Sequence, residues 1–446
     1  MAEDVRVLAL LVVLAVAAPL STRGQVLRGE RLAISDQHSK AGPSRRAGIQ
    51  VQASQDKCLP AIATWQKTYA VMHAEILKGV RPRRFAVAIL PEAGTADMLT
   101  GVLTFFYYAL FTKRAYQIQS YGLLPDFSMA FDSPFINWKS SYPDFLFEHM
   151  KFTYKWNQGY DGKRDPIFKR NAKSFTYWYL INNCTGADIF GRDDFHSIGP
   201  LNNSAPYAIL AANRGRTYAI GSSATYGPAV RQLGMRPQSL ARCAFLFLFT
   251  PNAGTQRKME PFLHSVADPM ALRIAIQIRV EDDIFTRDDY HVQNFSHFCS
   301  CAAEIEKHRR RPWHTRVIWY LTSDSLSVRR EAKQLYGEKL LTNTRSQALH
   351  TECASYNKSV CSRGVLKEAF QSAVADIYLM TKAQYHVVSC GSGFGNSGAW
   401  LSGEVSHPHT YIICEGIWAI KIVLPKNCAP QDALPFEAVS KFGAGR

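Results

Sequence analysis

The stretch Asp376-Ile-Tyr-Leu-Met-Thr-Lys-Ala-Gln-Tyr-His-Val-Val-Ser-Cys-Gly-Ser-Gly-Phe-Gly-Asn-Ser-Gly398 reads as the end of a helix, a short buried strand and a Gly/Ser turn that opens a second helix. Such a turn points backbone N–H groups and the positive end of a helix dipole at one spot, where an anionic phosphate binds. The glycines let the backbone approach a ligand closely, and Ser389, Ser392 and Ser397 add hydroxyl donors. The stretch therefore predicts an α/β protein that handles nucleotides.

Strand-like and helix-like patterns alternate along the rest of the chain. The run at 85–90 is continuously apolar, as is typical of a strand buried in a parallel sheet, and strand-like segments follow at 114–120, 207–213, 271–279, 317–324, 385–390 and 410–415. Helical spacing of apolar residues covers 58–78, 98–111, 297–309, 325–336 and 364–383. The alternation predicts two α/β halves that divide near residue 265. Ligands of such folds bind at the carboxyl ends of the strands.

The N-terminus has the pattern of an export signal. The apolar run from Val7 to Leu20 is too short for a comfortable membrane span, and Ala15-Val16-Ala17 is a plausible cleavage site. Residues 1–24 are therefore interpreted as a signal peptide, with a single-pass signal-anchor as the alternative. Residues 25–83 are expected to form a basic stem that ends in a helix.

Cysteines and glycosylation motifs agree with an oxidising compartment. The chain has 10 Cys, an even number that allows disulfides, and Cys353 with Cys361 and Cys414 with Cys428 could each close a small loop. Asn-x-Ser/Thr acceptors begin at Asn183, Asn202, Asn294 and Asn357. We expect a lumenal location in the Golgi or the endoplasmic reticulum.

Composition restricts the partners. The chain has 446 residues, 47% of them apolar, and a formal net charge of +16, which favours anionic partners such as nucleotide-sugars, anionic glycans, acidic membranes or nucleic acid. No recognised nucleic-acid-binding module is present, so no nucleic acid partner is expected. Cys299-x-Cys301 lacks a second pair or His ligands at finger spacing, so no metal site is expected either.

The Gly-rich turn has two rival interpretations. Gly393-Phe-Gly395-Asn-Ser-Gly398 matches the dinucleotide fingerprint, and Glu415 follows at the ~20-residue spacing of its ribose-binding acid. Against this, the intervening helix is broken by Gly403 and Pro408, and the short tail leaves no room for further strands. A purely structural Gly turn is the other alternative.

A second cluster of polar residues follows the strand at 271–279. Arg279 at a strand's carboxyl end can grip a diphosphate with two parallel N–H···O bonds and offset the charge of a leaving group. Glu281, Asp282 and Asp283 are candidate general bases that remove a hydroxyl proton. The alternative is an exposed Arg paired with an acidic loop. Asp324 ends the next strand and can accept hydrogen bonds from a base or sugar, or cap a helix.

These clusters carry a family resemblance. The segments 279–282, 320–324 and 376–392 occur in the order and spacing of the fucosyltransferase superfamily, and the chain resembles its core, nodulation and protein O-fucosyltransferase branches. In the N-terminal half, 94–101 and 109–115 echo a further motif of these enzymes. The resemblance covers most of residues 84–403.

The resemblance implies two Rossmann-like domains that face each other across a cleft, as in GT-B-type glycosyltransferases. Residues 84–265 would form the N-terminal domain on the acceptor side, and residues 266–446 the nucleotide-sugar domain. It implies an inverting, metal-independent enzyme whose co-substrate is a GDP-sugar, usually GDP-fucose, without a further cofactor. The acceptor would be a hydroxyl of a glycan or glycoprotein.

The resemblance also implies roles for individual residues. Arg279 would contact the β-phosphate and Asp324 the guanosine, and Ser392 with its neighbours would hold the diphosphate. The residues expected to bind the nucleotide-sugar are Gln277, Arg279, Asp324, Gly391, Ser392, Gly393, Phe394 and Asp97.

The chain departs from the family pattern at three positions. Gln277 replaces the family's His, Glu281 replaces a Gly, and Met98 replaces an Arg. The loss of two cationic side chains motivates a second hypothesis from a different class. On this hypothesis, the protein is a catalytically inactive, lumenal glycan- or nucleotide-binding member of the superfamily.

Overall fold

The computed structural model of the chain describes residues 57–90, 93–120, 125–139, 175–180 (backbone only), 205–212, 215–280, 295–345, 348, 361–403, 409–414 and 428–434. The chain divides into two units, residues 1–52 and residues 53–446, and only the second contains described residues. The predicted signal peptide or anchor and the acceptor asparagines of the four glycosylation motifs lie outside the described residues. Within the described part, no helix has the length and apolar character needed to cross a bilayer.

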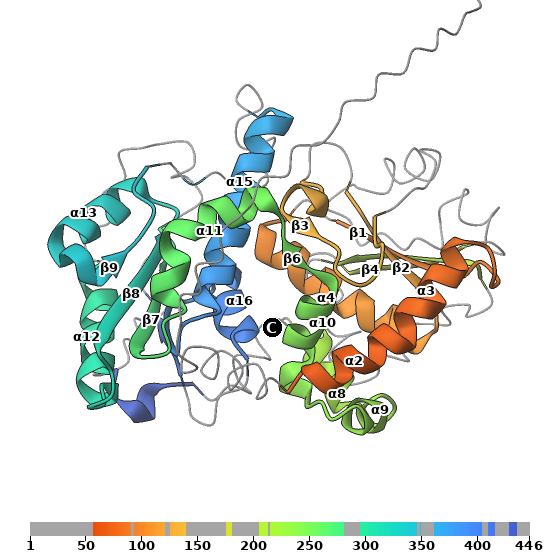
Figure 1. The fold of residues 1–446 in the computed structure, drawn as a ribbon, viewed down its shortest axis with the longest axis horizontal. Helices are drawn as coiled ribbons and strands as arrows, with labels where there is room; N and C mark the ends of the chain where they lie inside the picture. The colour runs from red at the N-terminus through yellow and green to blue at the C-terminus, as the bar shows by residue number, and fades with distance from the viewer. Residues whose placement is uncertain are drawn as a thin grey trace, which may run out of the picture. The chain divides into compact units, whose positions relative to one another are not determined.

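Two parallel sheets form the framework of the second unit (Figure 1). The first has the order β2 (Ala115–Gln119), β1 (Phe85–Ile89), β5 (Tyr207–Ala212), β4 (Phe175–Leu180). The second has the order β11 (Thr410–Ile413), β10 (Tyr385–Ser389), β7 (Ala271–Ile278), β8 (Arg316–Ser323), β9 (Leu340–Leu341). A small antiparallel pair joins β3 (Phe131–Asp132) to β6 (Thr250–Pro251).

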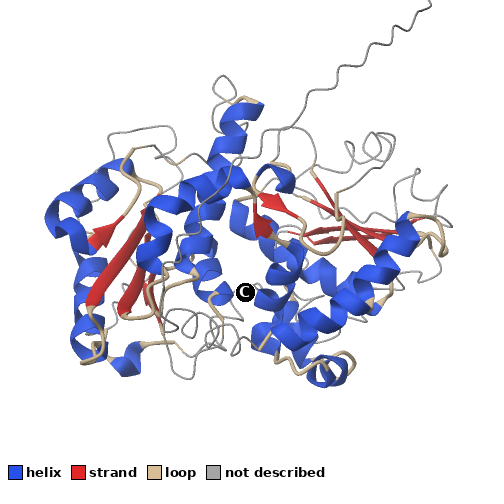
Figure 2. Cartoon of the chain, in the orientation of Figure 1, coloured by secondary structure: helices blue, strands red, loops and turns tan. Residues whose placement is uncertain are grey.

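Helices accompany both sheets, as Figure 2 shows. In the N-terminal half they are α2 (Leu59–Lys67), α3 (Tyr69–Leu77), α4 (Thr95–Phe111), α8 (Thr217–Ser222), α9 (Gly227–Gln232), α10 (Leu240–Leu248) and α11 (Ala253–Val266). In the C-terminal half they are α12 (Ser296–Arg309), α13 (Leu326–Tyr336), α15 (Arg363–Met380) and α16 (Gly393–Leu401). Short 3-10 turns are η1 (Phe127–Met129), η4 (Pro237–Ser239), η6 (Gly337–Lys339) and η7 (Pro430–Asp432).

The predicted α/β class is confirmed, and the apolar runs explain it. Every residue of β1 and of β7 is buried, which requires cover on both faces of each sheet. The described parallel strands β1, β2 and β5 belong to one half of the chain, whereas β7, β8 and β10 belong to the other. Ligands of such sheets lie beyond the carboxyl ends of the strands, so the candidate ligand site is expected at these ends.

The predicted stem helix at 58–78 consists of two helices. Helix α2 ends and α3 begins around Thr68, whose φ of −115° and ψ of −67° depart from helical values. The indole of Trp65 packs edge-on against Phe106 of α4 and Phe247 of α10, with ring centroids 5.3 and 5.4 Å apart. The helix pair is therefore anchored in the core of the N-terminal half.

Three disulfides connect described cysteines: Cys58–Cys243, Cys301–Cys428 and Cys390–Cys414. The predicted loop closed by Cys414 and Cys428 is therefore wrong. The reason is the sheet order: β10 and β11 are parallel neighbours, so the residues that follow them, Cys390 and Cys414, meet at one edge. Of the second predicted pair, Cys361 is disulfide-bonded and Cys353 lies outside the described residues.

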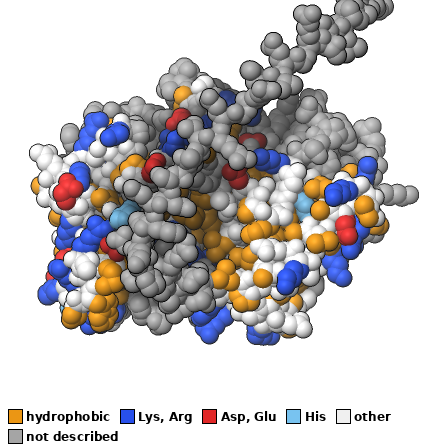
Figure 3. All heavy atoms as spheres, in the orientation of Figure 1, with side chains coloured by type: hydrophobic (Ala, Val, Ile, Leu, Met, Phe, Trp, Pro, Cys, Tyr) orange, Lys and Arg blue, Asp and Glu red, His pale blue; other side chains and the backbone are white. Residues whose placement is uncertain are grey.

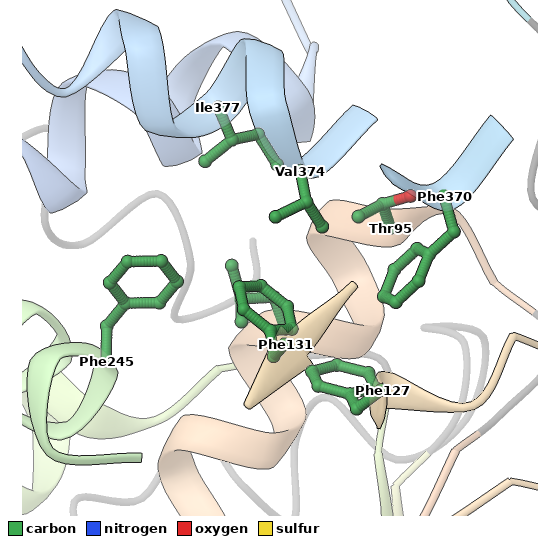
Figure 4. A pocket seen from close by; sticks show the side chains of 8 residues that line it. Thr95, Phe127, Phe131, Phe245, Phe370, Val374 and Ile377 are labelled. Atoms are coloured by element: carbon green, nitrogen blue, oxygen red, sulfur yellow. The ribbon is translucent and has the colours of Figure 1, made fainter. Parts of the chain in front are cut away.

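An apolar cavity lies inside the second unit, as Figure 4 shows. The space between these side chains has no room for a water molecule, and Thr95 is the one lining residue with a polar side-chain atom. The cavity is lined by Thr95, Leu99, Phe127, Phe131, Phe245, Phe370, Val374 and Ile377. This chemistry does not suit a phosphate, so the candidate nucleotide site is sought elsewhere.

Candidate nucleotide-sugar site

Three strand ends converge at one edge of the second sheet. Strand β7 pairs with β8 so that Ile278 lies opposite Ser323, and with β10 so that Gln277 lies opposite Val388. All three strands are parallel, so the residues that follow them emerge side by side. This register brings Arg279, Asp324 and the turn after Ser389 together, although they are widely separated in sequence.

Arg279 and Asp324 form an ion pair at this edge. The distance from Arg279 Nε to Asp324 Oδ2 is 3.4 Å, and the Arg279 side chain is 33% exposed whereas that of Asp324 is 6% exposed. The backbone N–H of Val280 donates to Asp324 Oδ1 at 2.9 Å. Burial raises the pKa of Asp324, while Arg279 and the hydrogen bonds oppose that rise. The buried carboxylate therefore orients a guanidinium that still reaches solvent.

The Gly/Ser turn is hydrogen-bonded to the same strand end. Ser389 Oγ accepts from the backbone N–H of Arg279 at 2.8 Å, and Ser389 O accepts from the N–H of Ser392 at 3.2 Å. Ser389 thus connects the backbone of Arg279, through these hydrogen bonds, to Ser392 in the turn at the start of α16.

The turn ends in a capped helix N-terminus. Gly391 has a φ of +74°, a conformation that favours glycine, and Ser392 is the N-cap residue whose hydroxyl accepts from Gly395 N at 3.3 Å. The N–H groups of Gly393 and Phe394 belong to the first helical turn, which has no acceptors inside the helix. These groups point with the helix dipole toward the position expected for an anion.

Gln277 lies beneath this turn. Its side chain is buried, and its Oε1 accepts from the N–H of Ser389 at 3.3 Å. A Cβ at Gly395 would come within 2.5 Å of the same oxygen and 3.0 Å of the Val388 Cβ. Only a glycine allows this approach. The contact between Gln277 and Gly395 therefore determines the distance between the first turn of α16 and strand β7.

The N-terminal half reaches the site through α4. Asp97 lies in the first turn of α4, and a Cβ at Gly393 would lie 3.4 Å from Asp97 Oδ1. The first turns of α4 and α16 therefore adjoin. Met98, which replaces the family's Arg, is fully buried in the core and offers no charge to this edge.

The predicted general bases Glu281, Asp282 and Asp283 lie outside the described residues. All the other predicted site residues are described and belong to the three strand ends or the first turns of α4 and α16. Cys301 of the Cys299-x-Cys301 motif is in a disulfide, and Cys299 is a buried free thiol. Within the described ranges, no cluster of three or more His, Cys, Asp or Glu side chains is arranged to hold a metal ion.

Sequence reasoning missed the part that Asp376 plays. Its carboxylate accepts from Tyr320 Oη at 2.6 Å and from Thr322 Oγ1 at 2.8 Å. Burial raises the pKa of Asp376, and the two hydroxyl donors counteract it. Asp376 therefore fastens α15 to β8, just before the Asp324 position. The sequence signal that could have identified Asp376 is its position at the start of the family motif 376–392.

Comparison with solved structures identifies the fold. A mutant of Arabidopsis thaliana FUT1 in complex with GDP matches with a TM-score of 0.52 at 14% identity, over 78% of this chain and 78% of that chain. Fucosyltransferase NodZ from Bradyrhizobium (TM-score 0.40, 14% identity, 72% of this chain and 93% of that one) and POFUT1 in complex with GDP (0.38, 10%, 76% and 99%) are also similar.

The resemblance to the fucosyltransferase superfamily that the motifs carry is thus confirmed at the level of the fold. No family model matches the sequence, and no curated protein matches it significantly.

Proposed function

We propose that the protein is a glycosyltransferase of the fucosyltransferase type, which transfers fucose from GDP-fucose to a hydroxyl of a glycan or glycoprotein with inversion. The observation that carries this proposal is the hydrogen-bonded cluster of Arg279, Ser389 and Ser392 at one sheet edge. The cluster places the residue that carries the guanidinium next to the N-terminus of α16, and these are the two groups best suited to a diphosphate. The fold shared with a GDP-bound FUT1 structure supports the same ligand.

In the proposed complex, the diphosphate lies at the start of α16 and accepts from the N–H groups of Gly393 and Phe394. Gly391 keeps the backbone close to the ligand, and the Ser392 hydroxyl caps the helix. Arg279 contacts the β-phosphate and offsets the charge that develops as the bond to the sugar breaks. Because Asp324 holds the guanidinium from behind, little reorganisation is needed when the donor binds.

The remaining roles follow the expected arrangement of two Rossmann-like domains, 84–265 and 266–446, across a cleft. Asp324 also lines the guanosine side, and Gln277 supports the donor site from beneath α16. Asp97, which lies beside Gly393, is the residue that the acceptor-side domain provides to the donor site. One of Glu281, Asp282 and Asp283 takes the proton of the acceptor hydroxyl as it attacks opposite the diphosphate. Neither a metal nor a cofactor enters this scheme.

The proposed location is the lumen of the Golgi or the endoplasmic reticulum. Three disulfides between described cysteines are consistent with an oxidising compartment. The proposed acceptor, a glycan or glycoprotein, occurs in the same compartment.

Two measurements test this function. Titration calorimetry of the purified chain with GDP, UDP and CMP should give heat with GDP alone, and a transfer assay with GDP-fucose should give product with an inverted anomeric centre. Binding of UDP or CMP in preference to GDP would overturn the donor assignment. Product with retained configuration would overturn the mechanism.

A second candidate function rests on Met98 and Gln277. Both replace cationic residues of the family, and both side chains are buried, so neither supplies charge to a transition state. A protein that binds GDP through Arg279 and α16 but neither transfers nor hydrolyses fucose would be a lumenal binding protein. GDP binding without turnover over a wide panel of acceptors would favour this alternative.

A further inference from the structure

A cluster of basic side chains surrounds the loop between α12 and β8. We call residues 307–316 the basic turn. It precedes β8, whereas the candidate nucleotide site follows β8. Since β8 has eight residues, the two regions are separated by the strand length of roughly 26 Å. The basic turn is therefore independent of the proposed donor site. Figure 3 shows Lys and Arg side chains on the side of the molecule that α12 and α13 cover.

In the part of the chain that the structure describes, the cations of the basic turn outnumber the carboxylates that form ion pairs with them. Glu304 lies 3.3 Å from Lys307 Nζ and 3.5 Å from His308 Nε2, Asp268 lies 3.0 Å from Arg316, and Glu306 pairs with Arg310 at 4.0 Å. Glu306 is shared, since Lys339 also contacts it. The cationic side chains are Lys307, Arg309, Arg310, Arg311, Arg316 and the neighbouring Lys339. Among the described residues, these six cations against the three carboxylates paired with them leave a local excess of positive charge.

The turn holds its shape through backbone bonds. Arg311 N donates to His314 Nδ1 at 2.9 Å, and His314 N donates to Arg311 O at 2.9 Å. Thr315 N donates to Met270 O at 2.9 Å, which fixes the turn to the start of β7. The pKa of His314 is lowered by burial and by Arg273, Arg310 and Arg311, in keeping with its role as a neutral acceptor. A preformed turn binds without a large ordering cost.

Trp313 stands at the tip of this turn with 61% of its surface exposed. Single exposed apolar residues are common on protein surfaces, so Trp313 indicates a binding surface only together with the cations beside it. An indole offers one flat apolar platform, whereas guanidinium groups form paired hydrogen bonds to planar or tetrahedral oxyanions. The ligand must therefore combine an apolar face with anionic groups at its rim.

We propose that the basic turn binds a sulfated glycan chain. A pyranose ring stacks its C–H face on Trp313, and the sulfates on either side pair with Arg310 and Arg311 before it and Arg316 after it. The charge excess matches a linear polyanion. A membrane surface would call for a broader apolar face than one indole and the partly exposed Met270 provide.

Affinity measurements with a size-defined heparin oligosaccharide test this proposal. The full chain should bind it, binding should weaken with added salt, and the chemically desulfated oligosaccharide should bind at least about tenfold more weakly. The double variant Arg310→Glu/Arg311→Glu should also lose about tenfold or more, and Trp313→Ala should lose about fivefold. Arg83→Glu, at an exposed basic residue remote in sequence, is the matched control and should bind within about twofold of the wild type.

Three results would overturn the proposal. One is equal loss in Arg83→Glu and in the double variant, since this would mean a general effect of net charge. Another is wild-type affinity in Trp313→Ala. The third is tighter binding to phosphatidylserine vesicles or single-stranded RNA than to the heparin oligosaccharide. Thermal unfolding of each variant confirms that it is folded, and if the double variant fails to fold, Trp313→Ala and the desulfated oligosaccharide decide the matter.

Discussion

Individual residues of the candidate site are fixed by close packing as well as by charge. Gln277 approaches the backbone of α16 because Gly395 has no side chain, and Asp324 holds Arg279 because both follow neighbouring strands. Sequence could single out Arg279, Asp324 and the glycines, since their residue types suit a diphosphate. It could not indicate that Gln277 is a support, because the contact with Gly395 exists only after β7 and α16 have packed together.

Gly395→Ala should destabilise the protein by about 2 kcal/mol, because the new Cβ would lie 2.5 Å from Gln277 Oε1 and 3.0 Å from Val388 Cβ. Urea denaturation measures the change. Gly364→Ala is the matched control, since its Cβ would meet only the Ser362 hydroxyl, at 3.9 Å, and should be neutral or stabilising. Equal stability of the two variants would refute the packing explanation.

Arg279→Ala should weaken GDP binding by about ten- to 100-fold, the range expected when a charged hydrogen-bonding partner is lost. It should also lower the unfolding temperature, because Asp324 would then be buried without its cation. Adding Asp324→Asn should restore stability but not GDP affinity. Arg257→Ala, at an exposed position on α11, is the control. Calorimetry that finds full GDP affinity in Arg279→Ala would remove this residue from the site.

At the scale of elements, sequence reasoning worked where the signal is local. Strand-like runs predicted the buried strands, and apolar spacing predicted α13 over 325–336, where Ser325 caps the helix and Gly337 ends it. The break between α2 and α3 at Thr68 was missed, because apolar spacing continues across it. The Cys390–Cys414 pairing was missed for a different reason: it depends on which strands become neighbours, and spacing along the chain does not contain that information.

Ser392→Ala should remove the N-cap of α16 and cost about 1 kcal/mol of stability. GDP affinity should fall as well, because the first turn of α16 would lose its fixed geometry. Ser362→Ala removes the equivalent cap of α15, so it should cost similar stability and leave GDP affinity unchanged. Parallel urea denaturation and calorimetry separate the two effects. Loss of GDP affinity in both variants would contradict a local role for Ser392.

Replacing Cys390 and Cys414 with Ser should cost about 3 kcal/mol of stability, the chain-entropy estimate for the loop they close, and should weaken GDP binding. Cys390 directly precedes the Gly/Ser turn, so its release loosens the donor site. Removing Cys301–Cys428, which closes a much longer loop, should cost more stability and leave GDP affinity unchanged in the folded protein. The opposite ranking in calorimetry would show that the first bridge does not shape the site.

At the scale of the whole molecule, parallel pairing gathers distant segments into one site. Predicting that strand ends meet required only the α/β alternation, and this carried Arg279, Asp324 and Ser392 correctly to one edge. The meeting of Asp97 with Gly393 could not be derived from spacing, since it depends on how α4 and α16 pack. Buried titratable groups such as His386 likewise emerge only from the packed structure.

His386 should make stability depend on pH. Burial lowers its pKa from the ordinary 6.5 to about 4, so the unfolded chain takes up a proton near pH 6.5 that the folded chain resists. Stability therefore falls as the pH drops from 6.5 to 4, by about 3 kcal/mol from this group. The raised pKa values of Asp324 and Asp376 act in the opposite sense, because ionisation of these carboxyls at higher pH disfavours the folded state.

Urea denaturation across this range isolates the His386 contribution by difference. His386→Gln keeps an N–H donor for Met380 O and removes the titration, so its stability should change less between pH 6.5 and 4 than that of the wild type. His264→Gln, at an exposed position on α11, should retain the wild-type profile. Identical profiles for wild type and His386→Gln would show that His386 does not cause the effect.

The bridge between Cys390 and Cys414 also determines how the protein must be produced. A host whose cytosol is kept reducing by glutathione and thioredoxin would leave these two thiols open and the neighbouring turn untethered. Material made there would report falsely low donor affinity even if it were soluble. A bacterial periplasm or a secreting eukaryotic host, in which isomerases can correct wrongly paired cysteines, is the appropriate source for every assay on this chain.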